Sequence, residues 1–137
     1  MYKNIMVPVD LAHPEKLTKA LAVSADLARH YGAILTAVSV TASAPTTVAH
    51  TPQEFAAKLK AFGEEQSKAH GVTFATRATV SPDPVIDMDD ALEKTASELG
   101  CDLVVMASHV PGFAEHIFAS RAGYLASHSA LSVLVVR

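Results

Sequence analysis

Short apolar runs alternate with amphipathic stretches along the whole chain. Four of the runs are almost continuously apolar, which is typical of strands buried on both faces of a parallel sheet. They are residues 5–9, 34–40, 102–107 and 132–137. A further segment, residues 72–80, carries mostly apolar side chains at every second position, as on one face of a strand. The pattern therefore predicts five strands.

Helices are predicted between the strands, because apolar side chains recur there at spacings of three and four residues. The expected helices cover residues 14–31, 52–70, 84–99 and 120–128. Thr51 and Glu54 form a capping box at the start of the second helix, which is a fairly specific start signal. A glycine follows each of the first three helices and provides a helix end.

Alternation of strands and helices favours right-handed crossovers, and so an open, five-stranded parallel doubly wound sheet flanked by helices, a Rossmann-like α/β fold. Because about 150 residues is an ordinary size for one domain, we expect a single domain over residues 1–137. The connection over residues 41–50 is polar, rich in small residues and contains a proline. We expect it to be the most flexible segment.

Composition narrows the class of protein further. Half of the 137 residues are hydrophobic, 18% are charged, and the net charge is −3. This excludes a disordered or low-complexity chain. The single cysteine, Cys101, excludes an internal disulfide, and no apolar run is long enough to span a membrane. Because lysine and arginine are scattered, nucleic-acid binding is not indicated. We expect a soluble cytoplasmic protein without a cleavable signal.

Candidate binding residues lie at the carboxyl ends of the predicted strands, where open parallel sheets bind their ligands. Asp10 follows the first strand and could accept hydrogen bonds from a ribose hydroxyl or an amino group, or cap the turn that follows it. Ser120 at a helix start could bind phosphate or cap its own helix. Arg121 could pair with phosphate or with a surface carboxylate. The residues alone leave these alternatives open.

Signatures of catalysis are missing from the sequence. It contains no Walker phosphate loop and no GxGxxG, GxSxG or CxxC motif. Ser24, Ser39 and Ser43 lack the sequence context of an activated nucleophile. The seven histidines include no pair at HxxxH spacing, and His109 with His116 would make only a weak zinc site. We therefore expect neither an enzyme nor a metal site.

Three segments of the chain resemble the universal stress protein family. Residues 7–10 (VPVD) resemble its opening strand, residues 103–109 (LVVMASH) its fourth strand and the following loop, and residues 132–137 (SVLVVR) its closing strand. The resemblance implies a five-stranded parallel α/β fold and a homodimer formed through the last strand. The dimer contacts implied are those of Val133, Leu134, Val135 and Val136. An exposed apolar edge invites such pairing, and the alternative is a strand covered within the monomer.

Members of this family either bind adenine nucleotides or do not. For the binders, the resemblance implies that Asp10 and a backbone group at Val40 contact the nucleoside, while Ser120 and Arg121 hold phosphates with His109 nearby. The nucleotide-binding residues implied in this way are Pro8, Val9, Asp10, Val40, Met106, Ala107, His109, Val110, Ala119, Ser120 and Arg121.

The phosphate loop departs from the family's pattern. Its three glycines are replaced by Ala107, Val110 and Ala119, and the spacing between the last two is one residue shorter. Valine neither adopts positive φ easily nor allows close backbone approach to a ligand. However, residues 107–111 (ASHVP) resemble a shortened form of the loop found in a branch of the family that still binds nucleotide.

Two principal hypotheses follow. In the first, a homodimer binds ATP or AMP at the carboxyl edge of the sheet, with Mg²⁺ accompanying ATP, hydrolyses it very slowly at most, and signals to a protein partner of unknown identity. In the alternative, a family member that binds no nucleotide acts as a dimeric protein-interaction module. A metal-dependent or small-molecule enzyme on the same fold is a third, weaker hypothesis.

Overall fold

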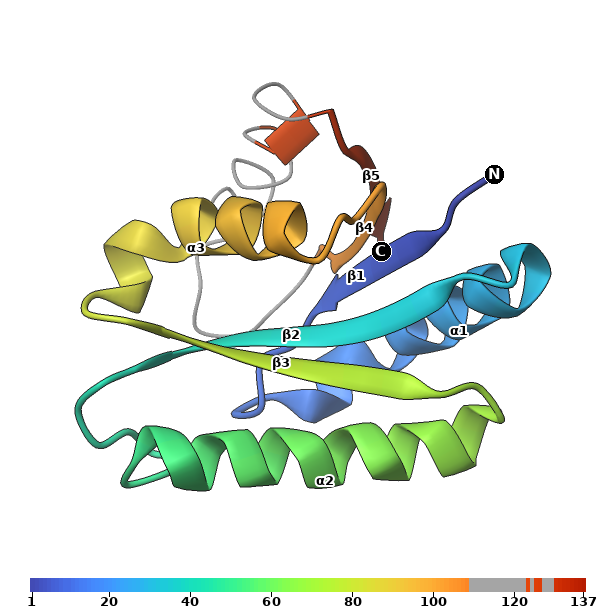
Figure 1. Cartoon of the computed structure of the whole chain (residues 1–137). Coiled ribbons are helices and arrows are strands. Elements are labelled where there is room, and N and C mark those ends of the chain that lie inside the picture. Colours follow the sequence, from blue (N-terminus) through green and yellow to red (C-terminus); the bar gives the residue numbers. More distant parts are fainter. Residues whose placement is uncertain (109–122, 124, 127–129) are drawn as a thin grey trace.

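Five parallel strands form one sheet in the order β3-β2-β1-β4-β5 (Figure 1). The computed structural model of the chain describes residues 1–108, 123, 125–126 and 130–137. The strands are β1 (Asn4–Pro8), β2 (Ile34–Ala42), β3 (Phe74–Ser81), β4 (Leu103–Ala107) and β5 (Ser132–Val136). The helices are η1 (Pro14–Leu17), α1 (Thr18–Tyr31), α2 (Pro52–His70) and α3 (Pro84–Glu98).

The strand order reverses between β1 and β4. The chain first builds outward from β1 to β2 and β3, then returns through α3 to the other side of β1 and adds β4 and β5. In Figure 1, α1 and α2 lie on one face of the sheet and α3 lies on the other. The predicted open, doubly wound parallel sheet is therefore confirmed. Its carboxyl edge beside the reversal is the usual binding edge of such folds.

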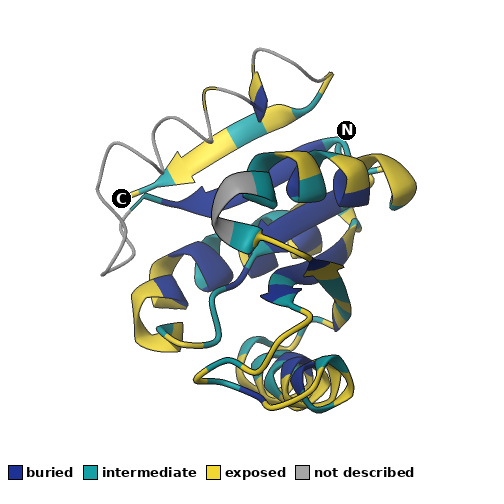
Figure 2. Cartoon of the chain, turned by 90° about the vertical axis from the view of Figure 1, so that its left-hand side faces the viewer, coloured by how far each residue is buried: buried dark blue, intermediate teal, exposed yellow. Residues whose placement is uncertain are grey.

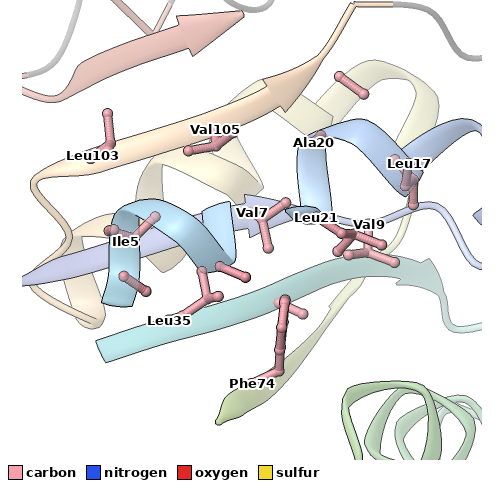
Figure 3. Close-up of a cluster of buried hydrophobic side chains, with 14 of the residues drawn as sticks. Ile5, Val7, Val9, Leu17, Ala20, Leu21, Leu35, Phe74, Leu103 and Val105 are labelled. Atoms are coloured by element: carbon pink, nitrogen blue, oxygen red, sulfur yellow. The ribbon is translucent and has the colours of Figure 1, made fainter. Parts of the chain in front are cut away.

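Each face of the sheet has its own apolar core. On the face covered by α1, Leu17 and Leu21 pack near Val7 of β1 and near Val9, which directly follows β1 (Figure 3). On the other face, Leu92 of α3 belongs to a second buried cluster. Because the central strands are buried from both sides, their nearly continuous apolar sequences follow directly from their position.

Capping residues fix the helix ends that the sequence predicted. The Oγ1 atom of Thr51 accepts a hydrogen bond from the backbone N–H of Glu54 at 3.0 Å, and Pro52 occupies the first helical position of α2. Gly71 ends α2 with φ of 65°, a left-handed conformation that glycine adopts without a steric penalty. The first helical segment differs from the prediction, since it begins as the 3₁₀ turn η1 and becomes α-helical only at Thr18.

The largest errors in the predicted strand boundaries are of two residues, and both concern the outer part of the sheet. β2 continues to Ala42, two residues into the expected loop, because its last residues still pair with β3. β3 begins at Phe74 rather than at Val72. The face of β3 that was predicted to be buried also becomes more exposed toward the carboxyl end of the strand, because the exposed fraction rises from 5% at Phe74 to 48% at Val80. An edge strand has a neighbour on one side only, so less of its length is covered.

Candidate functional site

The carboxyl ends of β1, β2 and β4 border a cavity of about 260 Å³. Figure 2 shows the molecule from the side on which these strand ends, the β2–α2 connection and the start of α3 come together. Six of the residues that the sequence singled out line this cavity: Pro8, Val9, Asp10, Val40, Met106 and Ala107. The cavity also borders residues from α2, α3 and the β2–α2 connection, so elements on both faces of the sheet contribute to it.

Asp10 caps the turn that follows β1. Its Oδ1 atom accepts a hydrogen bond from the backbone N–H of Ala12 at 2.9 Å, and its carbonyl oxygen accepts one from the N–H of His13 at 3.2 Å. The second carboxylate oxygen, Oδ2, has no hydrogen-bond partner among the described residues. The turn therefore orients the carboxylate at the cavity wall and leaves one oxygen able to accept a bond from a ligand.

Ser39 determines how β1 leaves the sheet. The N–H of Val9 still donates to the carbonyl oxygen of Val38 at 2.8 Å, but the next bond of a regular parallel ladder would run from the N–H of Val40 to the carbonyl of Val9. In the described part of the chain that bond is replaced: the Val9 carbonyl accepts from the buried Ser39 hydroxyl at 2.7 Å. The role of Ser39 is structural, and its only sign in the sequence is a polar residue within a buried strand.

Val40 consequently presents backbone groups toward the cavity. Backbone groups of a strand alternate between its two neighbours with a period of two residues, so the N–H and C=O of Val40 lie on the same side of β2 as the carbonyl of Val38. That side faces β1, which has already ended at Pro8. A backbone donor and acceptor are therefore exposed next to the cavity, where a flat ligand with complementary edge groups would satisfy them.

The remaining walls are largely apolar. Met106 and Ala107 at the end of β4 are buried, and Met88 and Leu92 of α3 lie on the same face of the sheet as Met106. Among the described residues that line the cavity, Asp10 is the only charged one. A lining of this kind favours an uncharged, predominantly aromatic group with a few fixed polar contacts.

Five of the predicted nucleotide-binding residues lie outside the described residues, namely His109, Val110, Ala119, Ser120 and Arg121. They belong to the predicted phosphate loop and the start of the helix expected over residues 120–128. Their assignments stay predictions.

The described residues offer no metal-ligand cluster, and their single thiol is unreactive. No group of three or more His, Cys, Asp or Glu side chains in that part of the chain is placed to hold a metal ion. Burial, with a smaller effect of the Asp102 carboxylate, raises the pKa of the Cys101 thiol to about 11. This thiol is therefore protonated at neutral pH and a poor nucleophile. Among the helices described, none has the length and apolarity needed to cross a bilayer.

The fold and the cavity define a doubly wound α/β protein with a binding edge at the strand-order reversal. The model of the universal stress protein family matches residues 1–137, and the chain belongs to this family. The sequence is 30% identical, over 146 aligned positions that cover all of both chains, to universal stress protein G of Escherichia coli O157:H7. It is 28% identical, again over all of both chains, to universal stress protein G of Salmonella typhimurium.

Solved structures share the fold. A universal stress protein from Archaeoglobus fulgidus matches with a TM-score of 0.73 and 19% identity over 100% of both chains. A universal stress protein in complex with cAMP matches with a TM-score of 0.71 and 21% identity, over 99% of this chain and 97% of that one. A universal stress protein from Archaeoglobus fulgidus in complex with dAMP matches with a TM-score of 0.69 and 17% identity, over 99% of this chain and 98% of that one.

Proposed function

We propose that this universal stress protein binds an adenine nucleotide in the cavity at the carboxyl edge of its sheet. The observation that carries the proposal is the pairing of two features at one cavity wall. The backbone N–H and C=O of Val40 can form hydrogen bonds with the acceptor and donor groups on the edge of a purine. The free oxygen of Asp10 can accept a hydrogen bond from a ribose hydroxyl. Together these contacts fix the orientation of the base and of the sugar in the cavity.

The cavity suits a purine in size and polarity. A cavity of about 150 Å³ lined by apolar side chains accommodates benzene. The 260 Å³ beside Val40 has room for a bicyclic base, and the apolar side chains of Met88 and Leu92 offer it a dry surface. The relatives crystallised with cAMP and with dAMP support the choice of adenine.

The phosphate end of the ligand depends on other residues. The proposal assigns Ser120 and Arg121 to phosphate, with His109 nearby, and includes both AMP and ATP as ligands, with Mg²⁺ accompanying ATP. Hydrolysis is very slow at most, since no general base or phosphate-loop lysine is evident in the sequence. The nucleotide then acts as a signal rather than as a substrate.

Signalling is proposed to run through a homodimer. Leu134 and Val135 of the edge strand β5 are 38% and 42% exposed, which is unusual for large apolar side chains in a strand. We propose that β5 of one protomer packs against β5 of a second, and that nucleotide occupancy alters how the dimer contacts a protein partner.

Asp10→Asn tests the nucleotide proposal. The amide keeps an oxygen that can cap the Ala12 N–H, so the turn survives, but it loses the charged acceptor for the ribose. Because a hydrogen bond to a charged group contributes about 1.5–3 kcal/mol, we expect AMP affinity to fall roughly 10- to 100-fold. Calorimetric titration of nucleotide-stripped protein measures this. Asp26→Asn, which changes an exposed carboxylate of α1 paired with Arg29, is the matched control and should bind as wild type.

A second ligand makes the assignment specific to the ribose. 2′,3′-Dideoxy-AMP lacks both ring hydroxyls, so Asp10→Asn should weaken its binding much less than that of AMP. Equal losses for the two ligands would contradict the contact between Asp10 and ribose. Absence of AMP binding to the wild type up to millimolar concentration would overturn the nucleotide proposal as a whole.

The alternative function is a dimeric interaction module without nucleotide. It is favoured by one specific observation, the replacement of the three loop glycines by Ala107, Val110 and Ala119. A wild-type protein that dimerises but gives no heat with AMP or ATP, and carries no adenine nucleotide after purification, would have this function.

A further inference from the structure

The cavity wall formed by the β2–α2 connection is a short turn bonded to itself. The backbone N–H of Thr46 donates to the carbonyl oxygen of Ala49 at 2.8 Å. The Oγ1 atom of Thr46 accepts from the N–H groups of Val48 and Ala49 at 3.3 and 3.2 Å. We call residues 46–49 the strap. Thr46, Thr47 and Val48 line the cavity, while Ala49 is buried beneath them.

Two charged side chains of α2 attach the strap to the body of the protein. The Lys58 Nζ atom donates a hydrogen bond to the carbonyl oxygen of Val48. The Oε2 atom of Glu54 accepts from the backbone N–H of His50 at 3.1 Å, directly after the strap. The other oxygen of Glu54 lies 3.3 Å from the Lys58 Nζ atom. Lys58 and Glu54 therefore bind the strap at Val48 and at His50, the residue directly after it. We call these two side chains the brace.

The brace is built from surface contacts. Both side chains are partly exposed, at 51% for Lys58 and 38% for Glu54, so each contact is weak on its own. Phe55, on the same turn of α2, is buried and fixes the helix against the cavity. A helix with a buried side that holds a wall segment through exposed contacts has the construction of a gate, because those contacts can break without unfolding the helix.

We infer that Lys58 and Glu54 are positioning residues for the binding cavity: they hold the strap closed and so set how fast a ligand leaves. This inference rests on the proposed function for the identity of the ligand, but the closure of the strap is a property of the ligand-free protein as well. The backbone hydrogen bond from His50, followed by the contact with Lys58, holds the pKa of the Glu54 carboxyl below its usual value, so this carboxylate is ionised at neutral pH.

Lys58→Met, which keeps the aliphatic stem and removes the donor, is the test. Lys60→Met is the matched control, since Lys60 is also an exposed lysine of α2 and makes no contact with the strap. In the ligand-free protein we expect amide hydrogen exchange at Val48 and Ala49 to become about fivefold faster in Lys58→Met only, as suits the loss of one exposed charged contact. Lys58→Arg retains a donor and should restore slow exchange.

The dissociation rate of AMP, followed by stopped-flow displacement, should rise by a similar factor of about five in Lys58→Met, with an unchanged thermal midpoint. Exchange equal to that of Lys60→Met would overturn the inference. So would faster exchange with an unchanged dissociation rate, because the strap would then move without controlling the ligand. If the wild type binds no AMP, the proposed function fails, whereas the exchange data still show whether the brace closes the strap.

Discussion

Asp102 joins the beginnings of β1 and β4 at the edge of the sheet opposite the cavity. Its two carboxylate oxygens accept hydrogen bonds from the backbone N–H groups of Lys3 and Asn4, at 2.9 and 3.1 Å. Burial by itself would raise the pKa of this carboxyl, but the bonds from Lys3, Asn4 and its own N–H together lower it below the ordinary value of 3.8. The ionised form is therefore the one that stabilises the fold.

Asp102→Asn should reduce the free energy of unfolding by about 1 kcal/mol at pH 7, less than the usual value for hydrogen bonds to charged groups because the site is partly exposed to solvent. Urea unfolding measures the change. Since the pKa of Asp102 is depressed in the folded state, its contribution is complete above pH 3.8 and is lost as the pH falls through the folded-state value. The wild type and the variant should therefore converge in stability on acidification. A gap that stays constant below pH 3.8 would contradict this account.

Part of the site could be predicted from single residues and part could not. Asp10 was identified because a general rule assigns ligands to the carboxyl ends of parallel strands. Val40 was implied by the resemblance to the universal stress protein family, and both residues line the cavity. Ser39 was set aside as a nucleophile, and its hydrogen bond to the Val9 carbonyl could not be foreseen. Such a bond depends on where β1 leaves its neighbour, and this is a property of two strands rather than of one residue.

At the scale of the element, α2 depends on a glycine at its interface with β3. Gly63 is buried on the same stripe as Phe55 and Leu59, eight residues after the first and four after the second. A Cβ atom at this position would lie 2.4 Å from Cγ2 of Thr76 and 3.3 Å from the carbonyl oxygen of Phe74. α2 therefore approaches β3 more closely than any residue with a Cβ atom at position 63 would allow.

Gly63→Ala should destabilise the protein by about 1–3 kcal/mol through overpacking, although alanine favours a helix over glycine by about 1 kcal/mol. Thr76→Ser removes the Cγ2 atom that the new methyl group meets. In the double variant we expect more than half of the loss to be recovered, while Thr76→Ser alone costs little. Thermal or urea unfolding of all four proteins completes the cycle. Additive effects would show that the contact between these two residues does not limit the packing of α2.

The elements themselves were largely predictable because their signals are local. The apolar runs of the strands, the capping box at Thr51 and the glycines after the helices are each contained within a few residues. Residues 41–50 were expected to be the most flexible segment because they are small and polar, and this stays a prediction. The contacts of Val48 and His50 with Lys58 and Glu54 of the next helix were not foreseen. The composition of a segment does not show which side chains of a neighbouring helix will form hydrogen bonds with it.

At the scale of the whole molecule, the two edges of the sheet expose comparable apolar side chains. Val135 on β5 is 42% exposed and Val80 on β3 is 48% exposed. The strand order puts them at opposite edges. Among the described elements the two edges differ in their neighbours: α2 and α3 both pack against β3, whereas β5 contacts α1 and its exposed ribbon lies at the rim in Figure 2. The β5 edge is therefore the better candidate for the proposed homodimer contact.

Val135→Glu should abolish that homodimer, because a twofold interface would bring two buried carboxylates together; we expect dimer affinity to fall by at least about 100-fold. Val80→Glu, an equally exposed valine changed in the same way, should leave the dimer intact. Sedimentation equilibrium of both variants separates these outcomes. Because no residue of β5 lines the cavity in the described part of the chain, monomeric Val135→Glu should still bind AMP with an affinity close to that of the wild type. A dimer that survives Val135→Glu but not Val80→Glu would move the interface to β3, and monomers that lose AMP binding would mean that the partner protomer helps to form the site.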